Sequence, residues 1–226
     1  MTLATDHTLT FDPVEHRYTL DGRDVPGVTT IINQTMRRPE LERWREWVGT
    51  EEADRIRDEA AEHGTLLHAA AAVIASDVED IPFGMDPGFA ESYAEFSAWF
   101  ETNVDEVLQL DDGPACEVPV YEPTFWYAGT ADAVLRLKGR KTYDLADWKT
   151  TWAVYPSVKM QTAAYRKAAQ QMFDVTIGGR ICVLVPRPKP GQQRPKLSVH
   201  RFDHHAADFN AFTYCLGLYR WQRGAN

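Results

Sequence analysis

Two apolar segments, 126–137 and 142–148, carry charged residues that strands of this kind cannot bury without partners. Asp132 lies within the first segment, Asp147 lies near the end of the second, and Lys149 directly follows the second. Because side chains alternate along a strand, the two-residue spacing puts Asp147 and Lys149 on the same face. If the two segments pair through the short turn between them, Asp132 lies near Asp147. A fold for this chain must therefore compensate a cluster of charges at these strands.

This cluster favours a metal site. Two carboxylates so close together repel each other, and one pKa rises unless a cation lies between them. Their oxygen ligands suit Mg²⁺ or Mn²⁺, and Lys149 beside the metal could hold a phosphate oxygen or help to deprotonate a water. The alternative is that Asp147 and Lys149 are two ordinary charges on a solvated strand face.

Two more side chains are candidates for the same site. The helix predicted for 51–76 has one apolar stripe, on which His68 follows Gly64 by four residues. Glycine at that position lets another backbone approach closely. The alternative for His68 is a core histidine that is hydrogen-bonded to a carbonyl. Glu117 lies among apolar residues of a predicted strand, so it needs a cation or a donor if it points inward.

The order of elements indicates an α/β protein of one domain, 1–226. We expect a central mixed β-sheet flanked by helices, with a β-hairpin and helices over residues 1–50 and the core over 51–226. The Asp21-Gly22 pair marks the hairpin turn, and Ser157 is the expected N-cap of a later helix. Helices are predicted at 28–35, 40–48, 51–76, 87–103, 157–172 and 206–223, and strands at 104–110, 115–121, 126–137, 142–148, 175–185 and 197–202.

Charge is unevenly distributed along the chain. The formal net charge is −9, but residues 1–113 hold 8 basic and 25 acidic residues, and residues 114–226 hold 16 and 8. The first half therefore includes a helical acidic segment, and the second half could face a polyanion. The alternative is an ordinary solvated acidic layer beside a basic one.

A basic stretch follows the predicted strand 175–185. The loop 186–196 is rich in proline, so it should project from the surface. We expect it to contact phosphates, unless it is merely a solvated hairpin. From residue 180 to residue 201 no acidic residue interrupts the basic ones, which are Arg180, Arg187, Lys189, Arg194, Lys196 and Arg201.

The candidate residues together form an ordered series that resembles the PD-(D/E)XK nuclease superfamily, in particular phage-type exonucleases of its RecB-like branch. The resemblance covers roughly residues 16–185 and implies a restriction-endonuclease-like core. The series is Gly64-Thr65-Leu66-Leu67-His68, Glu117, Gly129-Thr130-Ala131-Asp132, Asp147-Trp148-Lys149 and Gln161-Thr162-Ala163-Ala164-Tyr165, and it is preceded by His16-Arg17-Tyr18.

The resemblance implies a metal centre with one or two Mg²⁺ or Mn²⁺ ions. His68, Asp132 and Asp147 match the metal ligands of the family, and the backbone carbonyl of Trp148 matches a further ligand. Lys149 matches the catalytic lysine.

Other positions match supporting roles. Glu117 matches an acid that assists the metal or the water, and Gln161 and Tyr165 match a motif that contacts DNA or braces the site. Relatives with an iron–sulfur cluster need four cysteines. This chain has three, Cys116, Cys182 and Cys215, so we expect no such cluster.

The resulting hypothesis is a metal-dependent deoxyribonuclease, an exonuclease that acts on DNA ends in phage-type recombination, repair or replication. Expected partners are duplex DNA with free ends, a single-strand annealing protein and further copies of the chain. The alternatives are a structure-specific or restriction-like endonuclease, a catalytically silent binding module for DNA or a partner, and a phosphoesterase for small substrates. Because we find no secretory signal and no apolar span, we expect a cytoplasmic protein without membrane contact, in the host cytoplasm if it is phage-encoded.

Overall fold

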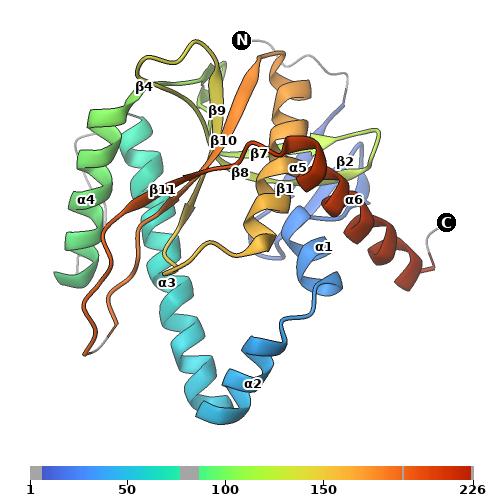
Figure 1. Cartoon of the computed structure of the whole chain (residues 1–226). Coiled ribbons are helices and arrows are strands. Elements are labelled where there is room, and N and C mark those ends of the chain that lie inside the picture. Colours follow the sequence, from blue (N-terminus) through green and yellow to red (C-terminus); the bar gives the residue numbers. More distant parts are fainter. Residues whose placement is uncertain (1–6, 77–86, 190, 225–226) are drawn as a thin grey trace.

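The computed structural model describes residues 7–76, 87–189 and 191–224, and its centre is a six-stranded mixed sheet (Figure 1). The strand order is β11-β10-β9-β8-β4, and β7 also pairs with β8. The strands are β4 (Val104–Val107), β7 (Cys116–Glu122), β8 (Tyr127–Leu137), β9 (Tyr143–Lys149), β10 (Ile177–Leu184) and β11 (Ser198–Arg201). The predicted mixed α/β sheet is thus confirmed at this level.

Only β9 and β10 run parallel, and the other neighbours in this sheet are antiparallel. A parallel pair needs a crossover, and helix α5 (Pro156–Phe173) provides it. The sheet curls because β8 is long enough to pair with β7 along one part and with β9 and β4 along another.

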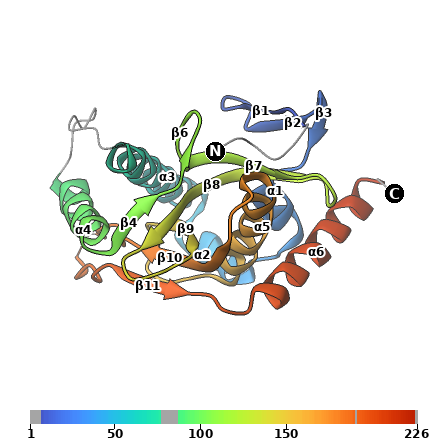
Figure 2. The same cartoon turned by 90° about the horizontal axis from the view of Figure 1, so that it is seen from above.

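Helices cover both faces of the sheet (Figure 2). On one face, α3 (Thr50–Ala75) and α4 (Pro87–Asn103) pack against the sheet through a core that includes Leu67, Phe96 and Trp148. On the other face, α5 packs on the sheet, and α1 (Val28–Thr35) and α6 (His205–Gln222) lie beside α5. The site described below therefore lies between two helical layers.

The N-terminal hairpin is part of a three-stranded sheet of β1 (Leu9–Asp12), β2 (Arg17–Leu20) and β3 (Arg23–Val25). Its predicted turn is present, with φ angles of 52° at Asp21 and 73° at Gly22. Strand β1 was not predicted. Buried residues of β2, β3 and α1 belong to the same hydrophobic cluster as residues of β8 and α5.

Three local predictions are wrong. Helix α5 begins at Pro156, its N-cap is Tyr155, and no side chain caps it, so Ser157 is not the N-cap. The predicted strand 104–110 is divided between β4 and β5 (Gln109–Leu110), which forms a small hairpin with β6 (Gly113–Pro114). No backbone approaches Gly64, because a Cβ built there meets nothing within 4 Å.

Helix α2 (Pro39–Val48) buries none of its residues, and Trp47 is 83% exposed. It joins α1 to α3 and, among the described elements, packs mainly against α3. Among the described residues, no helix combines the length and the apolar character that crossing a membrane requires.

Candidate active site

The site lies where β8 and β9 diverge. The two strands pair only from Ala133 opposite Ala146 to Leu135 opposite Asp144. Beyond Ala133, β8 continues with β7 as its neighbour, while β9 continues beside β10. Asp132 and Asp147 occupy the first positions after this pairing ends, so their side chains border the opening between the strands.

Lys149 links the two carboxylates. Its Nζ donates a hydrogen bond to Oδ1 of Asp147 at 2.7 Å and lies 4.0 Å from Oδ2 of Asp132. The same Nζ lies 3.2 Å from the backbone carbonyl oxygen of Trp148, and the Trp148 N–H donates to Oδ2 of Asp132 at 2.7 Å. The two-residue spacing therefore does place Asp147 and Lys149 on one face, as predicted.

Burial and proximity shift the charges of this group. Asp132 and Asp147 are 5% and 1% exposed. Burial raises the pKa of Asp147, and the positive charge of Lys149 lowers it. The neighbouring carboxylate of Asp132 raises it again, so that the pKa of Asp147 is about 6. Burial alone would lower the pKa of Lys149, but Asp147 and Asp132 outweigh it and raise that pKa above its usual value. Lys149 is therefore an ammonium group here.

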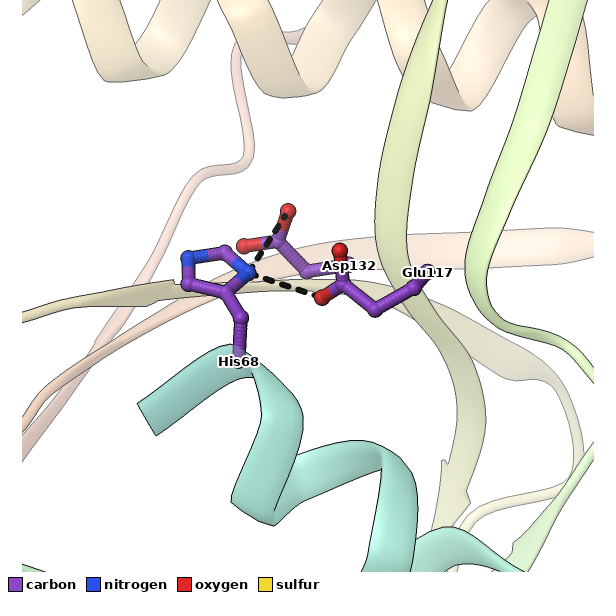
Figure 3. Close-up of side chains that lie close together, drawn as sticks. All are labelled: His68, Glu117 and Asp132. Atoms are coloured by element: carbon purple, nitrogen blue, oxygen red, sulfur yellow. Dashed lines mark hydrogen bonds and ion pairs between the residues drawn. The ribbon is translucent and has the colours of Figure 1, made fainter. Parts of the chain in front are cut away.

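His68 reaches the same opening from α3 and joins Glu117 and Asp132 (Figure 3). Nδ1 of His68 lies 2.7 Å from Oε1 of Glu117 and 3.8 Å from Oδ1 of Asp132. Burial lowers the pKa of His68, but the carboxylates of Asp132 and Glu117 more than compensate and raise it to about 9. Among the described residues, the partners of His68 are carboxylates and not a carbonyl, so the core-histidine alternative does not describe it.

Glu117 reaches His68 through an irregular backbone. Cys116 pairs with Ala133 and Val118 pairs with Ala131, which leaves Glu117 opposite Asp132. Its φ angle is 51°, a left-handed conformation that costs a residue with a Cβ about 1–2 kcal/mol. Such strain persists where the surrounding structure imposes it, often at functional sites. Glu117 is therefore a direct neighbour of His68.

These residues fit a divalent cation. One ligand atom each of His68, Glu117 and Asp132 lies within 4.8 Å of the others. Close by, Oδ2 of Asp147 is buried and has no hydrogen-bond partner among the described residues, which is costly for a carboxylate unless a cation or a water compensates it. Carboxylate oxygens with one imidazole suit Mn²⁺ or Mg²⁺.

Tyr165 lies beneath the site. It is 4% exposed, hydrogen-bonds with Gln161, and its pKa is raised well above the usual value, first by burial and then by Asp132. A Cβ on Gly129 would overlap Cε1 of Tyr165, so the ring packs directly against β8. Tyr165 therefore braces the strand of Asp132, which is the second of the two roles that the resemblance implies, and its ring is buried.

The basic residues of the second half of the chain fall into two groups, those that form ion pairs with carboxylates and those that form none with a described residue. Arg194 is 10% exposed and pairs with Glu91 and Glu95 of α4, at 3.1 and 2.8 Å. It ties the loop to the helix, and two carboxylates already pair with the guanidinium group that was predicted to contact phosphate. Arg180 is buried and pairs with Asp208, and the exposed Arg201 pairs with Asp144.

Arg187, Lys189 and Lys196 form no ion pair with a described residue. Nζ of Lys189 lies 4.2 Å from the centre of the Trp152 ring, and Nε1 of Trp152 donates to the Arg187 carbonyl at 2.8 Å. Trp152 follows Lys149 by three residues. The loop 186–189 is therefore joined to the segment that leaves the candidate site.

Two neighbours of the site were not predicted. The hydroxyl oxygens of Tyr18 and Thr130 lie 2.9 Å apart, which ties the N-terminal hairpin to β8 next to Asp132. Cys182 is in register with Asp147 on the adjacent strand, and burial, then Asp147, raises its thiol pKa. For the contact of Tyr18 with Thr130, the only indication in the sequence was the run His16-Arg17-Tyr18. Nothing in the sequence indicated that Cys182 lies beside Asp147.

No protein-family model and no curated protein sequence matches this chain. The site and the fold therefore carry the functional argument.

Proposed function

We propose that the protein is a metal-dependent deoxyribonuclease with a restriction-endonuclease-like core. The observation that carries the proposal is the buried group of Asp132, Asp147 and Lys149 at the opening between β8 and β9, joined from the other side by His68 and Glu117. Two buried carboxylates with a lysine have little structural value on their own, because hydrophobic residues would fill the same space at lower cost.

His68, Glu117 and Asp132 would hold a Mg²⁺ or Mn²⁺ ion, with Asp147 as a further ligand. Such an ion supplies Lewis acidity at a phosphoryl group and makes a nearby water more acidic. The histidine must give up its proton at Nδ1 to serve as a ligand. Glu117 lies 2.7 Å from this nitrogen, and the proton would leave to solvent, because Glu117 must stay a carboxylate to serve as a ligand.

Lys149 holds a positive charge beside the carboxylates. Its ammonium group can donate to a non-bridging oxygen of a phosphodiester and offset the negative charge that develops during hydrolysis. Asp147 fixes the position of Nζ through their 2.7 Å hydrogen bond. The backbone N–H of Trp148 similarly fixes the carboxylate of Asp132.

DNA as the substrate is favoured by the loop 186–189. Arg187 and Lys189 are free of carboxylate partners among the described residues, and Trp152 connects this loop to the segment after Lys149. Unpaired basic side chains beside a phosphoryl-transfer site can neutralise backbone phosphates on both sides of the scissile bond.

The test uses end-labelled linear duplex and a covalently closed circle of the same sequence, each with Mg²⁺, Mn²⁺ or EDTA. We expect metal-dependent degradation of the linear DNA only, which identifies an exonuclease. Asp147→Asn should abolish the activity, and Asp203→Asn, at an exposed position, should leave it intact.

The other outcomes distinguish the alternatives. Cleavage of both DNAs identifies an endonuclease. If neither DNA is cleaved and binding to DNA is retained, the protein is a binding module on this scaffold, and the proposed activity is wrong.

A further inference from the structure

The outer face of α6 carries no charge. A quarter of all residues in the chain are charged, and a helix face that meets solvent is ordinarily polar or charged. Tyr214 and Trp221 nevertheless expose 78% and 76% of their surface, and Leu218 exposes 41%. The exposed residues of α6 are Ala206, Ala207, Asn210, Tyr214, Gly217, Leu218, Trp221 and Gln222.

Among the described residues, α6 packs on one side, mainly against α1 and α5, and buries Phe212 and Leu216 (Figure 2). The uncharged face points away from these helices. It offers no cation to a nucleic acid, whose binding depends on Lys and Arg, and no counter-charge to an acidic or basic peptide. Its partner must therefore be an uncharged, partly aromatic surface.

Gly217 lies at the centre of this face, where no contact with a described residue requires a glycine. Glycine within a helix is less favourable than alanine, and a Cβ at this position would meet nothing within 4 Å. The missing side chain instead leaves a depression on the surface between the exposed Tyr214, Leu218 and Trp221.

The face is complementary to itself. If two copies of α6 cross antiparallel about a two-fold axis between positions 217 and 218, Tyr214 of each copy faces Trp221 of the other. Leu218 of each copy then faces the depression at Gly217. Positions 214 and 218 form one i,i+4 ridge and positions 217 and 221 another, which is the arrangement that packs ridges into grooves. A two-fold interface requires this reciprocity of contacts.

We propose that α6 is the interface of a homodimer, with Tyr214, Gly217, Leu218 and Trp221 at its centre. The two antiparallel helices also oppose their dipoles favourably. The proposal is independent of any nuclease activity, because none of these residues belongs to the candidate site.

The area of the face sets the strength of the dimer. A whole aromatic side chain covers about 200 Å², so Tyr214 and Trp221 leave about 150 Å² each to be buried. With Leu218 and the small residues, two copies would hide about 800 Å², less than the roughly 1,200 Å² of stable complexes. The dimer is therefore weak and forms in a concentration-dependent equilibrium.

Sedimentation velocity from about 5 to 500 µM tests this. We expect the average mass of the parent protein to rise toward that of a dimer with concentration. Trp221→Glu and Gly217→Leu should each weaken dimerisation at least tenfold, the first by adding a charge and the second by filling the depression. Trp47→Glu changes an equally exposed tryptophan on α2 and should associate like the parent.

Circular dichroism should show the same helix content in all four proteins, since the changed positions are exposed. A parent that stays monomeric up to 500 µM overturns the proposal. So does undiminished association of Trp221→Glu and Gly217→Leu, or a loss of association in Trp47→Glu alone.

Discussion

Nζ of Lys149 donates a 2.7 Å hydrogen bond to Oδ1 of Asp147, two residues earlier on the same strand. Because β8 turns away from β9 at this point, Asp132 faces the pair across the opening, and Nζ lies 4.0 Å from its Oδ2. One ammonium group thus holds together two carboxylates that would otherwise repel each other. The site depends on this strand divergence as much as on the residues.

Mn²⁺ should bind to His68, Glu117 and Asp132. We expect His68→Gln and Glu117→Gln each to weaken Mn²⁺ binding about tenfold or more, because each removes a group from the coordination sphere or its support. Electron paramagnetic resonance of free Mn²⁺ measures the affinity. His16→Gln, at an exposed position, is the matched control, and equal affinity of all these proteins would refute the metal site.

Acidification should destabilise the protein through His205. Its Nδ1 accepts a hydrogen bond from Nε of Arg180 at 2.9 Å, and burial, followed by the charges of Arg166 and Arg180, lowers its pKa. The unfolded chain, with a histidine pKa of about 6.5, then takes up the proton first. The contribution of His205 is therefore complete above about pH 6.5 and is lost as the pH falls below it.

Urea unfolding at pH 7.5 and pH 5.5 measures this effect. His205→Gln keeps a hydrogen-bond acceptor but does not titrate, so it should lose less stability between the two pH values than the parent. An equal loss in both proteins would show that His205 is not responsible. The other histidines are common to both and cancel in the comparison.

Much of the fold could be predicted from local patterns. The helices α1, α3, α4 and α5 lie within one or two residues of their predicted bounds, since apolar periodicity depends on each segment alone. The position of Asp132 beside Asp147 was also predictable, because pairing of consecutive strands follows from a short turn.

The environment of the site could not be predicted in the same way. That Arg194 meets Glu91 and Glu95 depends on contacts between residues about 100 positions apart, and no local pattern records them. The contact between Glu117 and His68 is equally non-local, because it joins β7 to α3 across 49 positions of the sequence. The type and spacing of the residues identified the candidates for the site. Only the tertiary structure shows which partner each of them contacts.

Replacement of two glycines by alanine should have opposite effects on the stability of the protein. Gly129→Ala should destabilise the protein by about 1–3 kcal/mol, because the new methyl group overlaps the Tyr165 ring in a packed region. Gly64→Ala should stabilise it by about 0.5–1 kcal/mol, since alanine favours helix and the space around Gly64 is open. Urea unfolding compares the two, and destabilisation by both would contradict the packing described for α3.

The loop 186–189 should contribute electrostatically to DNA binding. We expect Arg187→Gln combined with Lys189→Gln to weaken binding for all sequences and to reduce the slope of log K against log salt by about 1.8. Fluorescence anisotropy with the Lys149→Met protein avoids cleavage during the measurement. Arg194→Gln should lower stability and leave the slope unchanged, because Arg194 is already paired with α4. If Arg194→Gln changes the slope and the double variant does not, then Arg194 contacts the DNA phosphates and Arg187 and Lys189 do not.

The central claim is that Lys149 acts in metal-dependent hydrolysis of DNA, and its most direct test is the single-turnover cleavage rate of linear duplex with Mn²⁺. Lys149→Met should lower this rate by about 10²–10⁴ while the unfolding transition persists. Lys141→Met, at an exposed lysine of the same sheet region, should cleave like the parent. A Lys149→Met protein that retains more than a tenth of the parent rate would contradict the account.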